Sequence, residues 1–399
     1  MLMTRFLQDE RANILPMVGL ASTVIAGFVG AALDYSRANS VKAAMQSAVD
    51  ATGLMLSRDA PNMTPDERTQ KATDFFKAEF NRTDVKNVQV TANLSSPQQG
   101  NFQLNITASG DVDTTVARVL GQDQMHVSTS SEILWGIKKL ELALVLDNTG
   151  SMAQSGKIQA LKTAAHNLLT TLQNAAKQPG DVKVAIIPFD TTVNIGTGFK
   201  DEFWIDYSVK GIQKDQWDGC VIDRDQSNDV LDTAPVATNY HTFYPAADCG
   251  SLVQAMPLSN DWTALHSKVD AMTAAGNTNV TIGLVWGWHA LTAGVPYTNA
   301  APPAPDLDKV IVLLTDGTNT QNRWSSSESA IDARTAAACT NVKAANIKIY
   351  TVRVIDGSTT LLKNCATRTN MYYEVSQASQ LNGVFTAIAQ NLANLRLAK

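Results

Sequence analysis

The chain has 399 residues, of which 44% are hydrophobic and 17% are charged, and its formal net charge at pH 7 is −5. This length is enough for two or three domains and for at least one sizeable core. Acidic and basic residues are mixed along the chain, which argues against a nucleic-acid binder, because such proteins usually carry a basic face or stripe.

The first element is an apolar segment, Ile14–Leu33, whose 20 residues include only two polar side chains, Ser22 and Thr23. A helix needs roughly 20 apolar residues to cross the hydrocarbon core of a membrane. A signal peptide cleaved near Val29–Ala31 is the alternative. The segment is longer than the usual apolar core of such signals, and acidic residues precede it, so we predict an uncleaved membrane anchor.

The orientation of this anchor is predicted from the cysteines, because basic residues flank both of its ends equally. The four cysteines form two sequence-local pairs, with no CxxC motif and no histidine at metal-ligand spacing. We predict disulfides Cys220–Cys249 and Cys339–Cys365 in an oxidising compartment, with four buried thiols as the alternative. Disulfides would place most of the chain outside the cytoplasm and residues 1–13 inside it as a leader.

The helix is predicted to continue beyond the membrane, so that residues 14–60 form one long helix. Beyond the apolar segment, small and apolar residues follow each other at intervals of 4, 3, 4 and 3 residues, which places them along one face of a helix as a seam: Val41, Met45, Ala48, Thr52 and Met55. Within the membrane half, small residues recur every four positions and give a face that another helix could approach closely: Gly19, Thr23, Gly27 and Ala31.

Residues 61–137 are predicted to form a small α+β region. Thr64 is a good N-cap, followed by Pro65 and by Glu67 three residues after the cap. From Val85 to Trp135, β-branched and polar residues alternate between turn-rich segments, which predicts a small antiparallel sheet.

From residue 138 to residue 399, apolar strands alternate with amphipathic helices. Strands that are apolar on both faces predict a mostly parallel sheet covered by helices on both sides. A segment rich in Trp, Asp and Tyr, at about 198–258, interrupts this alternation and carries the first cysteine pair, so we interpret it as a surface insertion.

Oxygen-bearing side chains gather where the strands of this region are predicted to end. Asp147 and Asp316 each end an apolar strand, Thr149 and Ser151 follow Asp147, and Thr278 lies in a loop before a helix. Ligands bind at the carboxyl ends of strands in such sheets. Alternate residues of an extended stretch point the same way, so Asp147, Thr149 and Ser151 can converge on one ion. Carboxylates and hydroxyls without His or Cys suit Mg²⁺, or another divalent cation such as Mn²⁺ or Ca²⁺.

The three motifs, Asp-Asn-Thr-Gly-Ser, the later loop threonine and Thr-Asp-Gly, together resemble the metal-ion-dependent adhesion site of the von Willebrand factor A domain. The resemblance covers about 138–399 and implies an α/β fold with a Rossmann-like, doubly wound, mostly parallel sheet. It implies that Thr149 and Ser151 bind the ion directly, that Thr278 binds it directly or through water, and that Asp316 acts through water. An acidic group of a protein partner would complete the coordination.

The N-terminal part, from Thr4 to Leu54, resembles the TadG-like proteins of the tight-adherence (Tad/Flp) pilus assembly system: a charged leader, a membrane helix, Asp-Tyr and a long Ala-rich helix. The terminal Leu-Arg-Leu, 395–397, is similar too. This resemblance implies a single-pass protein of the bacterial inner membrane, with most of the chain in the periplasm or at the cell surface and a helix that docks among pilin-like helices. Ala12 replaces the glycine common in these leaders, which favours a permanent anchor.

Two other functions are alternatives for this sequence. A free-standing surface adhesin of the same fold is barely separable by sequence from a pilus component. A hydrolase is disfavoured, because Asn148 interrupts the Asp-Thr-Gly-Ser of aspartic proteases and the alternating helices do not fit an all-β protease. We therefore expect no enzyme activity. The five histidines are scattered and suggest no site, and Trp286 and Trp288 are predicted to pack or to line a surface rather than to bind a cofactor.

Overall fold

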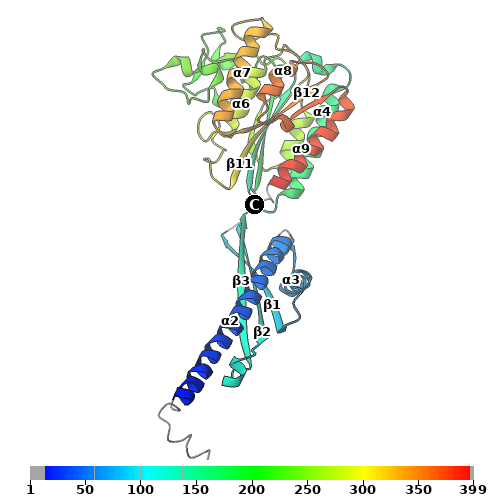
Figure 1. Cartoon of the computed structure of the whole chain (residues 1–399). Coiled ribbons are helices and arrows are strands. Elements are labelled where there is room, and N and C mark those ends of the chain that lie inside the picture. The colour runs from blue at the N-terminus through cyan, green and yellow to red at the C-terminus, as the bar shows by residue number, and fades with distance from the viewer. Residues whose placement is uncertain (1–13, 58, 99–100, 137, 396–399) are drawn as a thin grey trace, which may run out of the picture. The chain divides into compact units, whose positions relative to one another are not determined.

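Figure 1 shows the chain as a computed structural model, which describes residues 14–57, 59–98, 101–136 and 138–395. The leader predicted at 1–13, including Ala12, lies outside the described residues. The chain divides into two compact units, Met1–Gly136 and Ile137–Lys399, and each is treated by itself.

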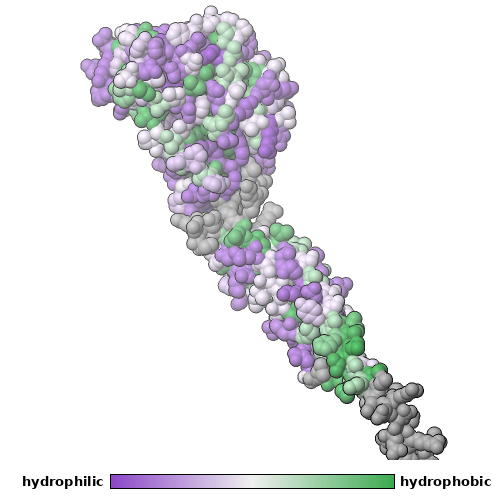
Figure 2. All heavy atoms as spheres, turned by 60° about the vertical axis from the view of Figure 1, so that its left-hand side comes forward, coloured by the Kyte–Doolittle hydropathy of each residue, from purple (hydrophilic) through white to green (hydrophobic). Residues whose placement is uncertain are grey.

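The N-terminal unit begins with one continuous helix, α2 (Ile14–Ser57), the single described helix long and apolar enough to cross a membrane. Its large apolar side chains between Met17 and Leu33 are exposed; Met17 and Phe28 are both 74% exposed. Figure 2 shows this part of the unit as a green surface. A helix that leaves so many apolar side chains uncovered needs a lipid or protein environment.

The second half of α2 buries its predicted seam against the rest of the unit, with one difference. Val41, Met45, Ala48 and Thr52 are buried, but Met55 is 49% exposed and Leu56 is fully buried instead. The buried stripe therefore advances by about 3.6 residues per turn, as in a straight helix on a sheet, rather than by the 3.5 residues of a coiled coil.

A helix and a sheet complete the N-terminal unit. The predicted capping box is present, with Thr64 and Glu67 bonded reciprocally at the start of α3 (Pro65–Glu79). An antiparallel sheet in the order β1-β2-β3 is made of β1 (Val85–Gln98), β2 (Asn101–Asp113) and β3 (Gln124–Gly136). Met45, Phe76 and Leu104 lie in its fully buried core.

The second unit is built on a six-stranded sheet in the order β10-β5-β4-β11-β12-β13. The strands β4, β5, β11, β12 and β13 are parallel to their neighbours, and β10 joins the edge antiparallel to β5. The strands are β4 (Lys139–Asp147), β5 (Val182–Phe189), β10 (Met256–Ser259), β11 (Leu307–Thr315), β12 (Lys348–Val354) and β13 (Tyr372–Val375).

Helices cover both faces of this sheet, as Figure 1 shows. Leu142 and Leu144 of β4 belong to a core shared with α4, α5 and α9, whereas Ala143 and Val145 belong to a second core shared with α6, α7 and α8. Successive residues of a strand point to opposite faces, so an unbroken apolar strand is what a doubly covered sheet requires. The helices are α4 (Lys157–Ala175), α5 (Trp262–Asp270), α6 (Val280–Leu291), α7 (Glu328–Ala344), α8 (Thr359–Cys365) and α9 (Leu381–Leu395).

The segment between β5 and β10 forms a small sheet of its own in the order β6-β8-β9-β7. Its strands are β6 (Val193–Asn194), β7 (Ile205–Asp206), β8 (Cys220–Val221) and β9 (Tyr244–Ala247). Residues 256–258, predicted as the end of the insertion, belong instead to the edge strand β10 of the main sheet. They pair with β5 because the backbone N–H and C=O groups along the outer edge of β5 need hydrogen-bond partners.

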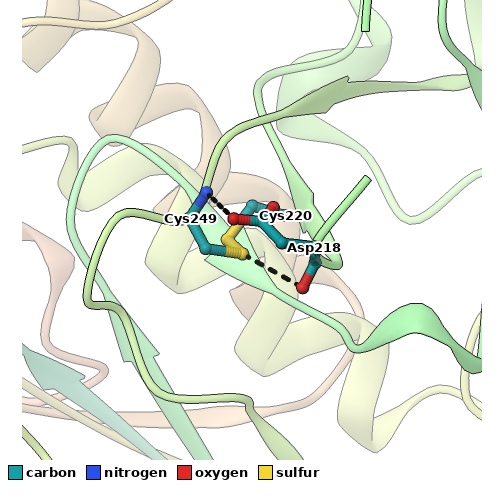
Figure 3. A group of neighbouring side chains, drawn as sticks. All are labelled: Asp218, Cys220 and Cys249. Atoms are coloured by element: carbon teal, nitrogen blue, oxygen red, sulfur yellow. Dashed lines mark hydrogen bonds between the residues drawn. A yellow bond between two sulfur atoms is a disulfide. The ribbon is translucent and has the colours of Figure 1, made fainter. Parts of the chain in front are cut away.

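Both predicted disulfides are present. Cys220–Cys249 closes the insertion and Cys339–Cys365 joins α7 to α8. Figure 3 shows Asp218 beside the first bridge, where its Oδ2 accepts a hydrogen bond from the Cys249 backbone N–H at 2.9 Å. Because the two sulfurs are bonded to each other, this cluster is a covalent link within the insertion rather than a metal site.

Candidate metal centre

The predicted site residues come together at the carboxyl edge of the main sheet. Asp147 is the last residue of β4, and Asp316 follows β11, the parallel neighbour of β4. The turn after β4 carries Thr149 and the 3₁₀ helix η4 (Gly150–Ala153), which contains Ser151. Thr278 directly precedes Asn279, the N-cap of α6.

Hydrogen bonds connect the hydroxyl and carboxylate groups of these loops. Ser151 Oγ donates to Asp316 Oδ1 at 2.6 Å and lies 3.0 Å from Thr149 Oγ1. The hydroxyl of Thr278 lies in the same region, because a Cβ built on Gly317 would lie 3.6 Å from both Ser151 Oγ and Thr278 Oγ1. All five predicted residues therefore border one small region.

Asp147 is fully buried, and both of its oxygens already accept hydrogen bonds. Oδ1 accepts from the Thr149 backbone N–H at 2.8 Å, and Oδ2 accepts from Thr315 Oγ1 at 2.6 Å. Burial, and secondarily the nearby Asp316 carboxylate, raise the pKa of Asp147 to about 6. Thr315 was missed by sequence reasoning, and the only signal was its position directly before Asp316.

Lys157 is the second residue that sequence reasoning missed. It is the first residue of α4, and its Nζ lies 2.5 Å from Asp316 Oδ2, with only 5% of the lysine side chain exposed. Asp316 Oδ2 is buried and makes no hydrogen bond among the described residues, so the ammonium is its charge partner. Ser155 and Gly156, at φ 54° and 69°, turn the chain so that Lys157 enters the site.

The loops of the site are fixed to each other through their backbones. Asn148, predicted to point away from the ion, donates from Nδ2 to Thr273 O at 2.9 Å, and Gly150 N donates to Gly276 O at 3.0 Å. The Thr278 backbone N–H donates to Thr320 Oγ1 at 2.8 Å. These three bonds fix the positions of the loops without involving the hydroxyls of Thr149, Ser151 or Thr278, as a preorganised ligand set needs.

The insertion reaches the border of this site, a relationship that the sequence did not reveal. Asp223, inside the insertion, is buried and accepts from Asn279 Nδ2 at 2.8 Å and from the Arg323 backbone N–H at 3.1 Å. Desolvation raises the pKa of Asp223 to about 6. Arg323 also pairs with Asp225 at 2.8 Å. These contacts attach the insertion to the loops next to Thr278 and Asp316.

The chemistry of this donor set fits a hard divalent cation. Two buried carboxylates face three hydroxyls, and neither imidazole nor thiolate belongs to the set. Burial first, and then the charge of Asp316, raise the pKa of Asp147, and among the described residues the partner of Asp316 Oδ2 is the ammonium of Lys157, so the site favours additional positive charge. The edge near Ser151 and Gly317 is only partly buried, so a ligand can approach there.

Comparison with known families gives one match, at the N-terminus. Residues 12–55 match the family model described as Tad, putative Flp pilus-assembly TadE/G-like. This confirms the predicted resemblance to TadG-like proteins over nearly the whole of α2. A search of curated proteins found no match.

Solved structures similar to this chain include adhesive proteins from several organisms. The pilus adhesin SpaC from Lactobacillus rhamnosus GG is 14% identical, with a TM-score of 0.42 over 79% of this chain and 35% of that one. The chain thus spans about a third of SpaC. The von Willebrand factor domain of the type V pilus tip protein Mfa5 from Porphyromonas gingivalis is 11% identical, with a TM-score of 0.41. That match covers 66% of this chain and 98% of the Mfa5 domain.

A mussel byssus protein is similar to the same extent. Proximal thread matrix protein 1, in a structure with a zinc-occupied adhesion-site motif, is 12% identical, with a TM-score of 0.40 over 64% of this chain and 48% of that one. These scores are too low to transfer a site or a function from any of the three proteins.

Proposed function

We propose that this protein is a non-enzymatic, membrane-anchored component of Flp pilus assembly or adhesion, whose second unit is a doubly wound von Willebrand A domain that binds a protein partner through a divalent cation. The convergence of Asp147, Thr149, Ser151, Thr278 and Asp316 on one edge of a sheet carries the proposal. The family match over residues 12–55 supplies the pilus context.

The anchor is α2, with its exposed apolar first half in the inner membrane. Two disulfides support a location of the second unit in the periplasm or at the cell surface, because disulfides persist in oxidising compartments and are rare in the cytosol. The membrane half of α2 would also meet pilin-like or assembly-system helices through its small residues.

In the metal site, Thr149, Ser151 and Thr278 would hold the ion, which we propose to be Mg²⁺, Mn²⁺ or Ca²⁺, while Asp147 and Asp316 balance its charge. A bound divalent cation supplies a positive centre that attracts a carboxylate of the partner. The partly buried edge at Ser151 and Gly317 is where that carboxylate would enter.

Calorimetric titration of the full chain in detergent tests the metal claim. We expect Mg²⁺ to bind, Asp147→Ala to abolish binding, and Asp356→Ala, at an exposed aspartate that follows β12 of the same sheet, to leave it unchanged. Absence of binding in the parent protein, or retention in Asp147→Ala, would contradict the claim.

Electron microscopy of the native bacterium tests the pilus role. Deletion of the gene is expected to remove the pili; wild-type protein and Asp356→Ala should restore them, and Asp147→Ala should not. Normal pili with lost surface attachment would instead identify a free-standing adhesin.

A further inference from the structure

The connection between β2 and β3 packs against α2 inside the apolar segment. Gly30 is buried there, and a Cβ on Gly30 would lie 2.2 Å from Cγ1 of Val116. Any larger residue at position 30 would therefore displace this connection. Figure 1 shows the connection beyond the end of β2, next to the N-terminal half of α2.

Asp34 fixes the same connection to the helix one turn later. Asp34 is buried, with 5% of the residue exposed, and its carboxylate accepts three backbone N–H bonds, from Thr115 at 2.8 Å, Val116 at 2.9 Å and Ala117 at 2.8 Å. Ala117 begins the 3₁₀ helix η3 (Ala117–Leu120), whose first N–H groups have no partners within their own turn. The β2–β3 connection is therefore held at a fixed height along the axis of α2.

That height lies at the end of the proposed membrane span. Gly30 precedes Leu33, the last residue of the apolar segment, by three residues, or about 5 Å along a helix. The headgroup and acyl boundary, where interfacial apolar groups insert, extends over about 5–10 Å. If Ile14–Leu33 crosses the membrane, η3 must meet this boundary.

The residues that η3 presents suit this boundary. Val119 is 85% exposed, more than any other large hydrophobic residue among those described. Its neighbour Arg118 has 72% of its side chain exposed and forms an ion pair with Asp123, at 3.2 Å. An aliphatic side chain beside an extended guanidinium matches the acyl region and the phosphates of a lipid surface.

We propose that η3 is a second membrane contact, in which Val119 inserts into the lipid interface beside the anchor and Arg118 meets the phosphates. The proposal rests on the anchoring role of α2 proposed above. It explains why Gly30 and Asp34 bind the β2–β3 connection so closely: together they would fix the N-terminal unit at a set height and tilt on the membrane surface.

Fluorescence quenching in vesicles tests the contact. The full chain would carry a single added cysteine labelled with bimane, in phosphatidylglycerol-containing vesicles with a lipid nitroxide at acyl carbon 5. All four native cysteines are in disulfides, so they do not take the label. The positions are Val119→Cys, Ile25→Cys inside the span, and Leu134→Cys as the matched control.

Leu134 is a suitable control because it is also an exposed apolar residue, at 63%, but lies at the other end of β3, about 30 Å from Gln124. We expect position 119 to lose about half of its fluorescence, as for shallow insertion, and position 134 to lose none. Quenching at 25 without quenching at 119 would overturn this proposal and leave the anchor intact. No quenching at either position would overturn both.

Discussion

The ammonium group of Lys157 lies 2.5 Å from Oδ2 of Asp316, inside the group of carboxylates and hydroxyls that would bind a divalent cation. Both side chains are buried, at 5% and 0% exposure, so water screens this ion pair little. The lysine supplies part of the positive charge that two adjacent buried carboxylates need. A metal ion in this site would therefore share Asp316 with a permanent cation of the protein.

Replacing Lys157 by Met is expected to tighten Mg²⁺ binding by at least about tenfold, or about 1.4 kcal/mol, because a competing charge is removed. Without metal, the same variant should be less stable by about 3 kcal/mol, since Asp316 is left buried and unpaired. Calorimetric titration and thermal unfolding with and without Mg²⁺ measure both effects.

Lys162→Met, at the next lysine of α4, is the control, because Lys162 bonds Asp270 O outside the site. An unchanged Mg²⁺ affinity in Lys157→Met would show that the lysine does not act on the metal.

Replacing Thr315 by Val removes the hydroxyl that donates to Asp147 Oδ2 at 2.6 Å and keeps the side-chain shape. We expect a loss of about 1–3 kcal/mol in unfolding free energy, because a buried carboxylate oxygen loses its donor. Mg²⁺ affinity should also change. Thr351 is the matched control, because it is buried on the neighbouring strand β12 and its hydroxyl donates to Leu362 O of α8. Thr351→Val should lower stability and leave Mg²⁺ affinity as it was.

The stability of the second unit should fall as pH rises from about 4 to about 6. In the folded protein the pKa of Asp223 is about 6, against an ordinary value of 3.8. Between these two pH values the carboxyl ionises in the unfolded protein but keeps its proton in the folded protein, so the free energy of unfolding falls by about 3 kcal/mol. Below about pH 4 both states hold the proton, and above about pH 6 the difference is constant.

Asp223→Asn should reduce this slope in metal-free urea titrations without abolishing it, because Asp147, with the same raised pKa, and Asp190, whose pKa is raised by burial, contribute the rest. A slope identical to that of the parent protein would rule out Asp223 as a source.

Removing the Cys339–Cys365 disulfide is expected to lower the unfolding free energy of the second unit by about 2–5 kcal/mol. The bridge constrains the unfolded chain between α7 and α8, and it lies in the core on the α6 face of the sheet. A Cys339→Ala, Cys365→Ala double variant, compared with the parent in urea, measures this loss. An equal midpoint in the two proteins would show that packing alone holds α8.

The sequence predicted much of this architecture, because its signals are local. The apolar run at 14–33, the capping box at Thr64 and the apolar strands each act through neighbouring residues, so periodicity and composition were enough to locate them. Asp147 and Asp316 were also predictable, since parallel strands bring their carboxyl ends to one edge wherever they pair. The sequence alone therefore determined the kinds of element and the residue types at that edge.

The tertiary structure decided which groups meet across long separations. No spacing in the chain connects Lys157 to Asp316, Asp223 to Asn279, or Gly30 to Val116, because each contact depends on how separate elements pack. Packing also turned Thr315, which received no role from the sequence, into a hydroxyl donor to Asp147 Oδ2. Local propensity fixes where a strand ends, whereas the charge balance of a buried site depends on every side chain that packing brings within reach of it.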